Sequence, residues 1–193
     1  MKSEYLHLIK HISQFISVSS SEIETITNAF EITNVKKNII LEKENQLTNY
    51  LYFINNGFLR VFYVNDGEER TTQINCPSKF ITSFESFINT TKAYDNVETI
   101  TNCQLLRINK QNLDELNYKV KNWRIFTEKI YEQALMFNEE RTRDMILLNA
   151  EQRYKKLIAL QNDIAKNVPI QYIASYIGIK PESLSRIRKK IIS

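Results

Sequence analysis

Short segments rich in β-branched and aromatic residues follow one another between residues 39 and 108, and they restrict the fold more than any other feature. Two of them, residues 50–54 and 58–64, are separated by Asn55-Asn56-Gly57. The second ends at Asn65-Asp66-Gly67, a strong hairpin signal because glycine adopts a positive φ without a Cβ clash. Further strands are expected at residues 71–74, 97–101 and 104–108. This many short strands predict a β-roll or jelly roll and argue against an alternating α/β fold.

Helical segments flank this region on both sides. Residues 22–30 follow Ser19-Ser20-Ser21, whose hydroxyl groups can cap a helix. A longer helix is expected from about residue 118 to 148, because apolar residues recur there at spacings of three and four. A small β-domain cannot cover so long a helix, so we expect a second copy of the chain to pack against it. The predicted dimer interface consists of Trp123, Phe126, Ile130, Ala134 and Phe137.

The charged residues are unevenly distributed. The net charge is +4, and residues 168–193 carry all of it, so the rest of the chain is neutral overall. This last segment contains Lys180, Arg186, Arg188, Lys189 and Lys190 against Glu182 alone. A neutral body with a basic end is typical of a protein that binds a polyanion, most often nucleic acid. A solvated basic helix end is the simpler alternative.

The same segment has the pattern of two short helices joined by a tight turn. Pro169 and Pro181 each suit the start of a helix, where the missing N–H costs nothing. Gly178 falls in the turn between them, where a left-handed backbone is needed. Ala174 is small enough to let the second helix cross closely. The shared core is expected to consist of Ile173, Ile177, Leu184 and Ile187. This arrangement predicts a helix-turn-helix, with an ordinary helical hairpin as the alternative.

The second of these helices would present a polar face that suits the major groove of DNA. The planar guanidinium of Arg186 matches the O6 and N7 acceptors of guanine, and Glu182 can accept from the N4 amine of cytosine. Arg188 and Lys190 are better suited to phosphates, which add affinity without sequence choice. The predicted DNA-contacting residues are Gln171, Lys180, Glu182, Ser183, Ser185, Arg186, Arg188 and Lys189.

Over essentially its whole length the chain resembles the Crp/Fnr family of bacterial transcription regulators. Residues 52–63, followed by Asp66-Gly67-Glu68, are similar to the β-roll signature of that family. Residues 173–178 and 181–186 look like its DNA-reading motif. In the oxygen-sensor branch of the family, the recognition helix reads bases with a Glu-x-x-Ser-Arg pattern. That pattern is present here at Glu182, Ser185 and Arg186.

The resemblance implies an α+β chain in three parts. These are a β-roll over residues 1–117, a dimerisation helix over residues 118–148 and a helix-turn-helix domain over residues 149–193. It also implies a cytoplasmic homodimer that binds palindromic double-stranded DNA and contacts RNA polymerase. Only two residues follow Ile191, so the hairpin wing of many relatives is expected to be reduced or absent.

The family members that bind cyclic nucleotides use a Gly-Glu pair and an Arg-Ser or Arg-Thr pair. The arginine neutralises the cyclic phosphate, and the carboxylate binds the ribose hydroxyl. Here Thr82 and Ser83 occupy the positions of the first pair, and Ala93 and Tyr94 those of the second. The resemblance therefore implies a degenerate ligand pocket and a regulator that does not respond to cyclic AMP. Two alternatives remain: a sensor of an unidentified small-molecule effector, and a ligand- or protein-binding module without a role on DNA.

Other chemistries have weak support. An iron–sulfur cluster needs about four thiolates, whereas the chain has only Cys76 and Cys103, which are typical of reduced cytosolic thiols. His7 and His11 could share one face of a helix, but such a pair is more often a surface or interface feature than a metal site. We expect no catalytic site, cofactor, metal or membrane span, and hence no enzyme. Glu151 and Arg153, where the two domains would join, are expected to form a hinge salt bridge.

Overall fold

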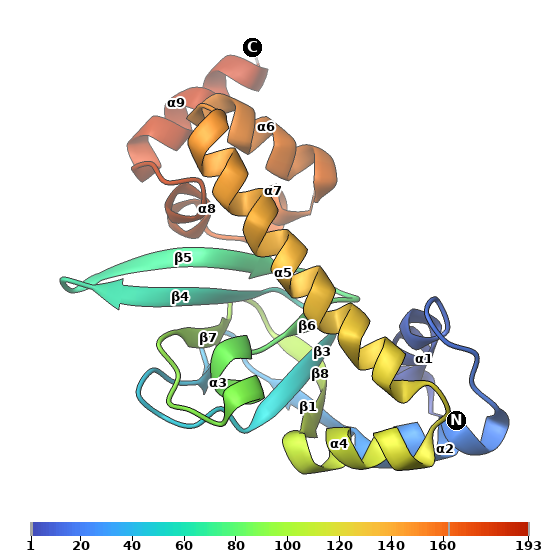
Figure 1. Cartoon of the computed structure of the whole chain (residues 1–193). Coiled ribbons are helices and arrows are strands. Elements are labelled where there is room, and N and C mark those ends of the chain that lie inside the picture. The colour runs from blue at the N-terminus through green and yellow to red at the C-terminus, as the bar shows by residue number, and fades with distance from the viewer. Residues whose placement is uncertain (1, 162, 193) are drawn as a thin grey trace.

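The computed structural model describes residues 2–161 and 163–192, which form a β-roll, a long helix and a helical C-terminal unit (Figure 1). The predicted α+β class is confirmed. The strands are β1 (Glu31–Val35), β2 (Ile40–Glu42), β3 (Tyr50–Asn56), β4 (Leu59–Asn65), β5 (Glu68–Asn75), β6 (Phe80–Ile81), β7 (Asn96–Thr99) and β8 (Cys103–Asn109). A 3-10 turn at Ser3–Tyr5 precedes the helices α1 (Leu6–Ile12), α2 (Ser20–Ala29), α3 (Phe84–Asn89), α4 (Lys110–Lys119), α5 (Trp123–Leu147), α6 (Ala150–Leu160), α7 (Ile164–Asn167), α8 (Ile170–Tyr176) and α9 (Pro181–Ile192).

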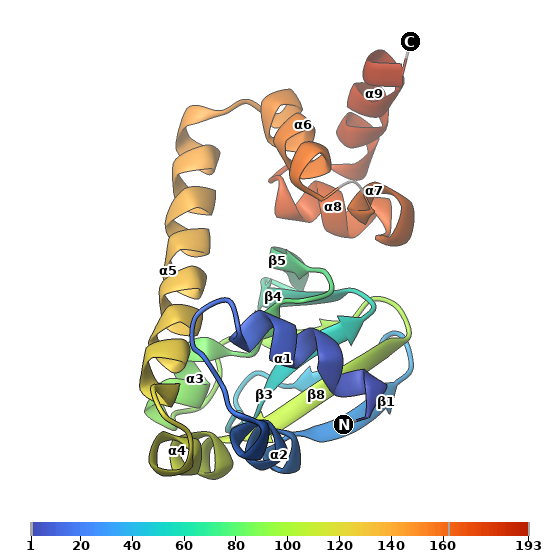
Figure 2. The ribbon, with the colours of Figure 1, turned by 90° about the vertical axis from the view of Figure 1, so that its right-hand side faces the viewer.

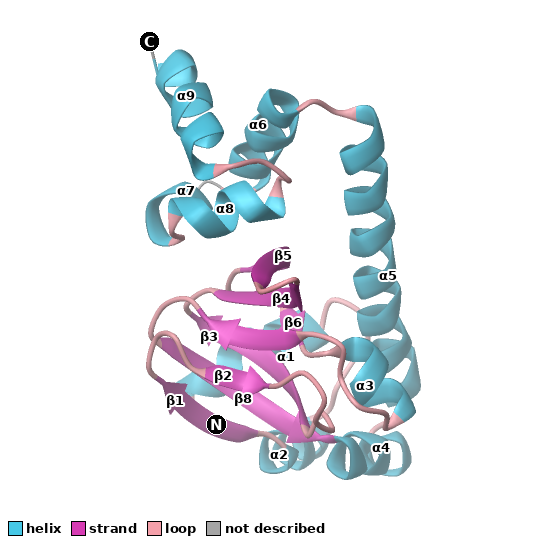
Figure 3. Ribbon diagram, turned by 90° about the vertical axis from the view of Figure 1, so that its left-hand side faces the viewer, coloured by secondary structure: helices cyan, strands magenta, loops and turns pink. Residues whose placement is uncertain are grey.

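Two antiparallel four-stranded sheets form the roll, with the strand orders β1-β8-β3-β6 and β2-β7-β4-β5 (Figure 3). Asn55 and Asn56 end β3 in the first sheet, and Gly57 and Phe58 connect it to β4 in the second. The apolar side chains between the sheets include Tyr52, Ile54, Leu59, Val61, Val97 and Leu105. The predicted β-roll is therefore confirmed.

The β4–β5 hairpin closes at the predicted Asp66-Gly67 turn. Asn65 pairs with Glu68 in antiparallel register, so Asp66 and Gly67 alone make the turn. Both have a positive φ, 51° for Asp66 and 76° for Gly67, as the favoured two-residue hairpins require. The hairpin extends beneath the C-terminal unit, and its second strand contacts α8 (Figure 1).

The long helix begins later than the sequence pattern predicts. Residues 118 and 119 belong to α4, and α5 begins only at Trp123. Asn122 precedes it with a φ of 62°, in the left-handed region. A residue with this backbone cannot continue a right-handed helix, so the expected continuous helix from residue 118 is broken here.

The apolar stripe at the start of α5 is buried inside the same chain. Trp123, Phe126 and Ile130 are 0%, 1% and 4% exposed, respectively. They belong to a core that also contains Leu8, Ile12, Phe53, Leu113 and Leu116. The prediction that these three residues face a second copy is wrong, because the N-terminal helices and the roll cover them. Further along the helix, Ala134 and Phe137 are half-buried.

The C-terminal unit has its own core and docks on the roll. That core includes Tyr154, Leu157, Ile164, Ile173, Ala174, Ile177 and Leu184. Phe58, Ile74 and Ile100 of the roll belong to the same cluster, so the two parts share an apolar contact. Of the helices described, none is both long and apolar enough to cross a membrane.

Candidate functional site

Helices α8 and α9 form the helix-turn-helix that the sequence predicts. Gly178 lies in the turn with a φ of 75°, and a Cβ there would come within 2.7 Å of Met145 Cε. The Ile179 N–H donates to the Ala174 carbonyl at 2.9 Å and closes the end of α8. Ala174 and Leu184 are fully buried where the two helices pack together. The small residue, the turn glycine and the second proline therefore have the structural roles expected of them.

The outer face of α9 is open to solvent. Glu182, Arg186 and Lys189 are exposed, and Ser183, Ser185 and Arg188 are half-buried. Gln171 at the start of α8 and Lys180 just before α9 are exposed as well. Among the described residues, no carboxylate lies within 4.0 Å of the charged groups of Lys180, Arg186, Arg188 or Lys189. These cations are therefore free to bind an anion.

Lys190 differs from its neighbours on α9. Its Nζ lies 3.0 Å from Glu151 Oε2 on α6, and Glu151 also pairs with Lys155 at 2.7 Å. These two lysines lower the pKa of the Glu151 carboxyl to about 2. Lys190 thus contacts α6 while its side chain stays 74% exposed, and its contact with a DNA phosphate stays a prediction.

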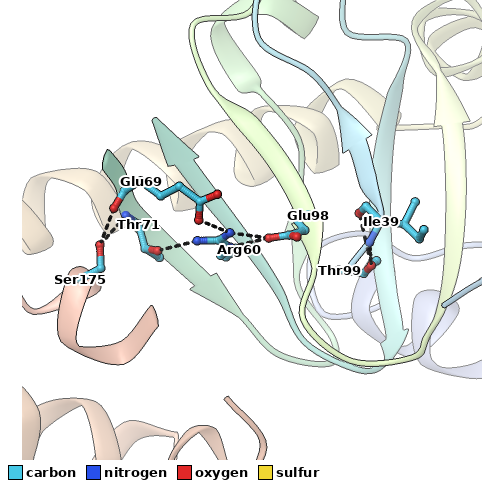
Figure 4. A network of polar contacts seen from close by, with 7 residues as sticks. All are labelled: Ile39, Arg60, Glu69, Thr71, Glu98, Thr99 and Ser175. Atoms are coloured by element: carbon cyan, nitrogen blue, oxygen red, sulfur yellow. Dashed lines mark hydrogen bonds and ion pairs between the residues drawn. The ribbon is translucent and has the colours of Figure 1, made fainter. Parts of the chain in front are cut away.

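A polar network fixes α8 on the second sheet of the roll (Figure 4). The Thr71 N–H donates to Ser175 Oγ at 2.9 Å, and Ser175 Oγ in turn donates to the Glu69 carbonyl at 3.3 Å. Arg60, only 2% exposed, donates to both Glu69 and Glu98 at 2.6 Å. Its guanidinium also stacks 3.7 Å from the ring centroid of Tyr172 on α8. A buried arginine paired with two carboxylates thus bridges the roll and the helix-turn-helix.

Sequence reasoning missed this network. The only signal was Arg60 itself, a lone charge within the apolar run at residues 58–64. Ser175 and Thr71 are 104 positions apart, and nothing in their spacing indicates that they meet.

Two arginines hold the junction between the long helix and α8. Arg153 donates to the carbonyls of Ile177, at 3.0 Å, and Leu148. Arg141 on α5 donates to the Tyr176 carbonyl at 3.4 Å. Cations at the carbonyl ends of helices interact favourably with the helix dipole. The expected Glu151–Arg153 salt bridge is wrong, because Glu151 pairs with two lysines and Arg153 binds main-chain oxygens instead.

The predicted ligand-pocket residues lie together in the roll. Thr82, Ser83 and Tyr94 line a cavity of about 300 Å³, whereas Ala93 is 2% exposed and absent from its lining. Asp95 also lines it, and burial raises the pKa of that carboxyl. The one cation among the described lining residues is Arg141, which comes from α5. Sequence reasoning missed Arg141, because the pattern offered no clue that this part of the helix reaches the roll.

The histidines and cysteines do not form a metal site. His7 and His11 lie four residues apart on α1, but His11 is buried among aromatic rings whereas His7 is exposed. In the part of the chain that the structure describes, no three His, Cys, Asp or Glu side chains are grouped to hold a metal ion. Cys76 and Cys103 are free, and burial raises the pKa of both thiols.

Comparison with known proteins identifies the fold. Residues 32–117 match the family model of the cyclic nucleotide-binding domain. FixK2 from Bradyrhizobium japonicum has a similar structure, with a TM-score of 0.72 and 13% identity over 84% of each chain. A protein from Eubacterium rectale assigned to the Crp/Fnr family of transcriptional regulators has a TM-score of 0.71 and 13% identity over 98% of this chain and 87% of the other.

The c-di-GMP-responsive global regulator CLP of Xanthomonas campestris has a TM-score of 0.67 and 17% identity over 90% of this chain and 91% of its own. No curated protein sequence matches significantly. The chain therefore has the fold of the Crp/Fnr transcription regulators, with a domain of the cyclic nucleotide-binding type at residues 32–117.

Proposed function

We propose that this protein is a sequence-specific DNA-binding transcription regulator that acts as a homodimer on a palindromic operator. The observation that carries the proposal is the outer face of α9, which is solvent-exposed and bears cations without carboxylate partners in the described chain. The apolar side of the same helix is packed on α8 through Leu184. A rigid helix with such a face has the shape and charge needed to enter a major groove.

Each polar residue of α9 has a distinct proposed role. Arg186 reads a guanine through O6 and N7, and Glu182 accepts a hydrogen bond from a cytosine N4 amine. Arg188 and Lys189 bind phosphates and so contribute affinity that falls as salt rises. Ser183 accepts a 3.4 Å hydrogen bond from Arg186 and orients its guanidinium.

The dimer would form along the solvent face of α5. Ile125, Leu135, Met136 and Ile146 are between 45% and 75% exposed. They lie on the side of the helix opposite to Trp123, and large exposed apolar side chains on one face are typical of an interface. A second copy packed there would bring the two recognition helices to about 34 Å, one turn of DNA.

The roll cavity does not suit a cyclic nucleotide. Ala93 stands where the phosphate-binding arginine of the family is expected, and the cavity lining includes the carboxyl groups of Glu85 and Asp95. These carboxyl groups do not favour a phosphate, and Arg141, on α5, is the one cation among the described lining residues. We therefore propose that cyclic AMP is not the effector. As for other regulators of this fold, we also propose that the protein acts in the cytoplasm, with RNA polymerase as a further partner.

Variants of α9 test the proposal. Arg186→Ala should weaken binding to the cognate operator by about 1–3 kcal/mol and relax the preference at one base pair. Lys189→Ala should lower the slope of log K against log salt by about one and leave base preference unchanged. Lys119→Ala on α4 removes the same charge at the far end of the molecule and serves as the control (Figure 1). Equal binding by all three variants and the wild-type chain would exclude α9 from the DNA interface.

A further inference from the structure

A groove of about 760 Å³ lies between α5, the roll and the C-terminal helices. It adjoins the roll cavity that Thr82 and Ser83 line, because Gln73, Phe84 and Arg141 line both. In Figure 2, the C-terminal half of α5 lies opposite α6 and α8, and residues of all three helices line the groove. All three parts of the fold therefore contribute to its walls.

The apolar part of the groove is open to solvent. Leu160 on α6, which lines it, is 69% exposed. Such exposure of large apolar side chains in a concave surface indicates a ligand site more often than an unoccupied surface. The remaining apolar lining includes Phe80, Phe84, Ile130, Phe137 and Leu157.

Two arginines line the same groove without an acidic partner. Among the residues described, no carboxylate oxygen lies within 4.0 Å of the guanidinium of Arg141 or Arg153. Arg153 binds two main-chain carbonyls, whereas Arg141 makes one hydrogen bond of 3.4 Å and its buried Nε has no partner. A partly buried charge without a counter-ion is costly, so an anion bound at this site would be stabilised.

The neighbouring acids do not fill that role. Lys156 engages both Glu140 and Asp144, at 2.6 and 2.5 Å, so both carboxylates are bound to this lysine rather than to Arg141 or Arg153, although its single charge balances only one of them. Burial lowers the pKa of Arg141, and the positive charge of nearby Arg153 lowers it further. The two guanidinium groups bind the carbonyls of adjacent residues, Tyr176 and Ile177, so they lie at the same end of α8, and a single anion there would be attracted to both.

We propose that this groove binds an amphiphilic anion, with its acidic head group between Arg141 and Arg153 and its apolar body along Leu160 and Phe137. A carboxylate, sulfonate or phosphate head group would accept hydrogen bonds from the free Arg141 Nε and from the neighbouring guanidinium. Such a ligand would contact α5, α6 and α8 together. Its influence on DNA binding rests on the proposed function, whereas its binding to the groove does not.

Fluorescence titration with 8-anilinonaphthalene-1-sulfonate, an aromatic sulfonate that emits in apolar sites, tests the proposal on the full chain without DNA. We expect saturable binding of one molecule per chain. Arg141→Met removes the head-group contact and should weaken binding about tenfold, the usual effect of losing a charge-assisted hydrogen bond. Arg124→Met, on an exposed part of the same helix, is the matched control and should bind as the wild type does.

Leu160→Glu provides a variant that cannot be explained by misfolding, because Leu160 is already exposed. It should also weaken binding about tenfold, and decanoate should displace the dye at lower concentration than 1-decanol or inorganic phosphate. Absence of saturable binding, or equal affinity in the wild type and in both groove variants, would overturn the proposal. Displacement by phosphate as effective as by decanoate would contradict the apolar half of the site.

Discussion

His11 is an imidazole packed among phenylalanine rings. Its ring centroid lies 5.5 Å from that of Phe15, 5.7 Å from Phe53 and 5.8 Å from Phe80. Its Nε2 is buried without a hydrogen-bond partner among the described residues. Burial is the main reason that its pKa falls below the ordinary value of 6.5, and the charge of Lys79 adds to the effect. The folded chain therefore holds this histidine in the neutral form.

This burial predicts a loss of stability in mild acid. Below pH 6.5 the unfolded chain gains a proton at His11 and the folded chain does not, until the pH reaches the lower folded pKa. The free energy of unfolding should therefore fall between pH 7 and 5, by at most about 1.4 kcal/mol per pH unit from this group. Urea unfolding of His11→Phe should show a smaller pH dependence than the wild type. His7→Gln, at an exposed position, should show the same pH dependence as the wild type. If the free energy of unfolding of His11→Phe depended on pH as strongly as that of the wild type, burial of His11 would not be the cause of the acid sensitivity.

For individual residues, the sequence predicted the structural roles of some and not of others. Gly178, Ala174 and Pro181 could be placed because turn geometry and close helix packing restrict the residue type locally. Arg141 and Arg60 could not, because their importance depends on which distant strand or helix each one meets. A single charged residue in a helical or strand pattern gives no information about such a neighbour.

At the scale of elements, the docking of α8 on the β4–β5 hairpin connects the roll to the helix-turn-helix. Ser175 accepts from the Thr71 N–H, and Tyr172 stacks on the buried Arg60. Arg60 also binds Glu98 on β7, the strand that follows the roll-cavity residue Asp95. A continuous series of contacts therefore links that cavity to α8 through β7 and Arg60.

Ser175→Ala tests this connection. The Thr71 N–H would lose its acceptor at a buried position, which should lower the free energy of unfolding by about 1–3 kcal/mol. Native-state hydrogen exchange should show faster exchange of the Thr71 amide and of the first residues of α8. Ser13→Ala, at an exposed position in the N-terminal region, is the control. Unaltered exchange at Thr71 would mean that Ser175 does not hold the two parts together.

The dimer interface predicted at the start of the long helix was wrong because of how whole elements pack. A spacing of three and four indicates that one face of a helix is apolar, but not which neighbour covers that face. Trp123, Phe126 and Ile130 pack on the chain's own core, and the residues left for a partner lie on the other side. The β4–β5 hairpin was predictable because its turn is specified by two adjacent residues.

For the whole molecule, the proposed binding to a palindromic operator requires a homodimer. The solvent face of α5 carries the exposed apolar residues Leu135 and Met136 about midway along its length. The double substitution Leu135→Glu with Met136→Glu places charge at the centre of the proposed interface. It should convert a dimer into single chains of 22.8 kDa in sedimentation analysis, with the fold retained. Tyr118→Glu, at a residue 92% exposed on α4, is the control, and a double variant that stays dimeric would exclude this face.

Selection from random duplex DNA by the purified full chain, at near-physiological salt and without added ligand, directly tests whether the protein binds DNA sequence-specifically as a homodimer. If a homodimer binds DNA through α9, the selection should recover a palindromic motif whose half-sites lie about one helical turn apart. Each half-site should contain a guanine at the position assigned to Arg186. Recovery of duplexes without any common motif, in a preparation whose fold is intact, would contradict this proposal.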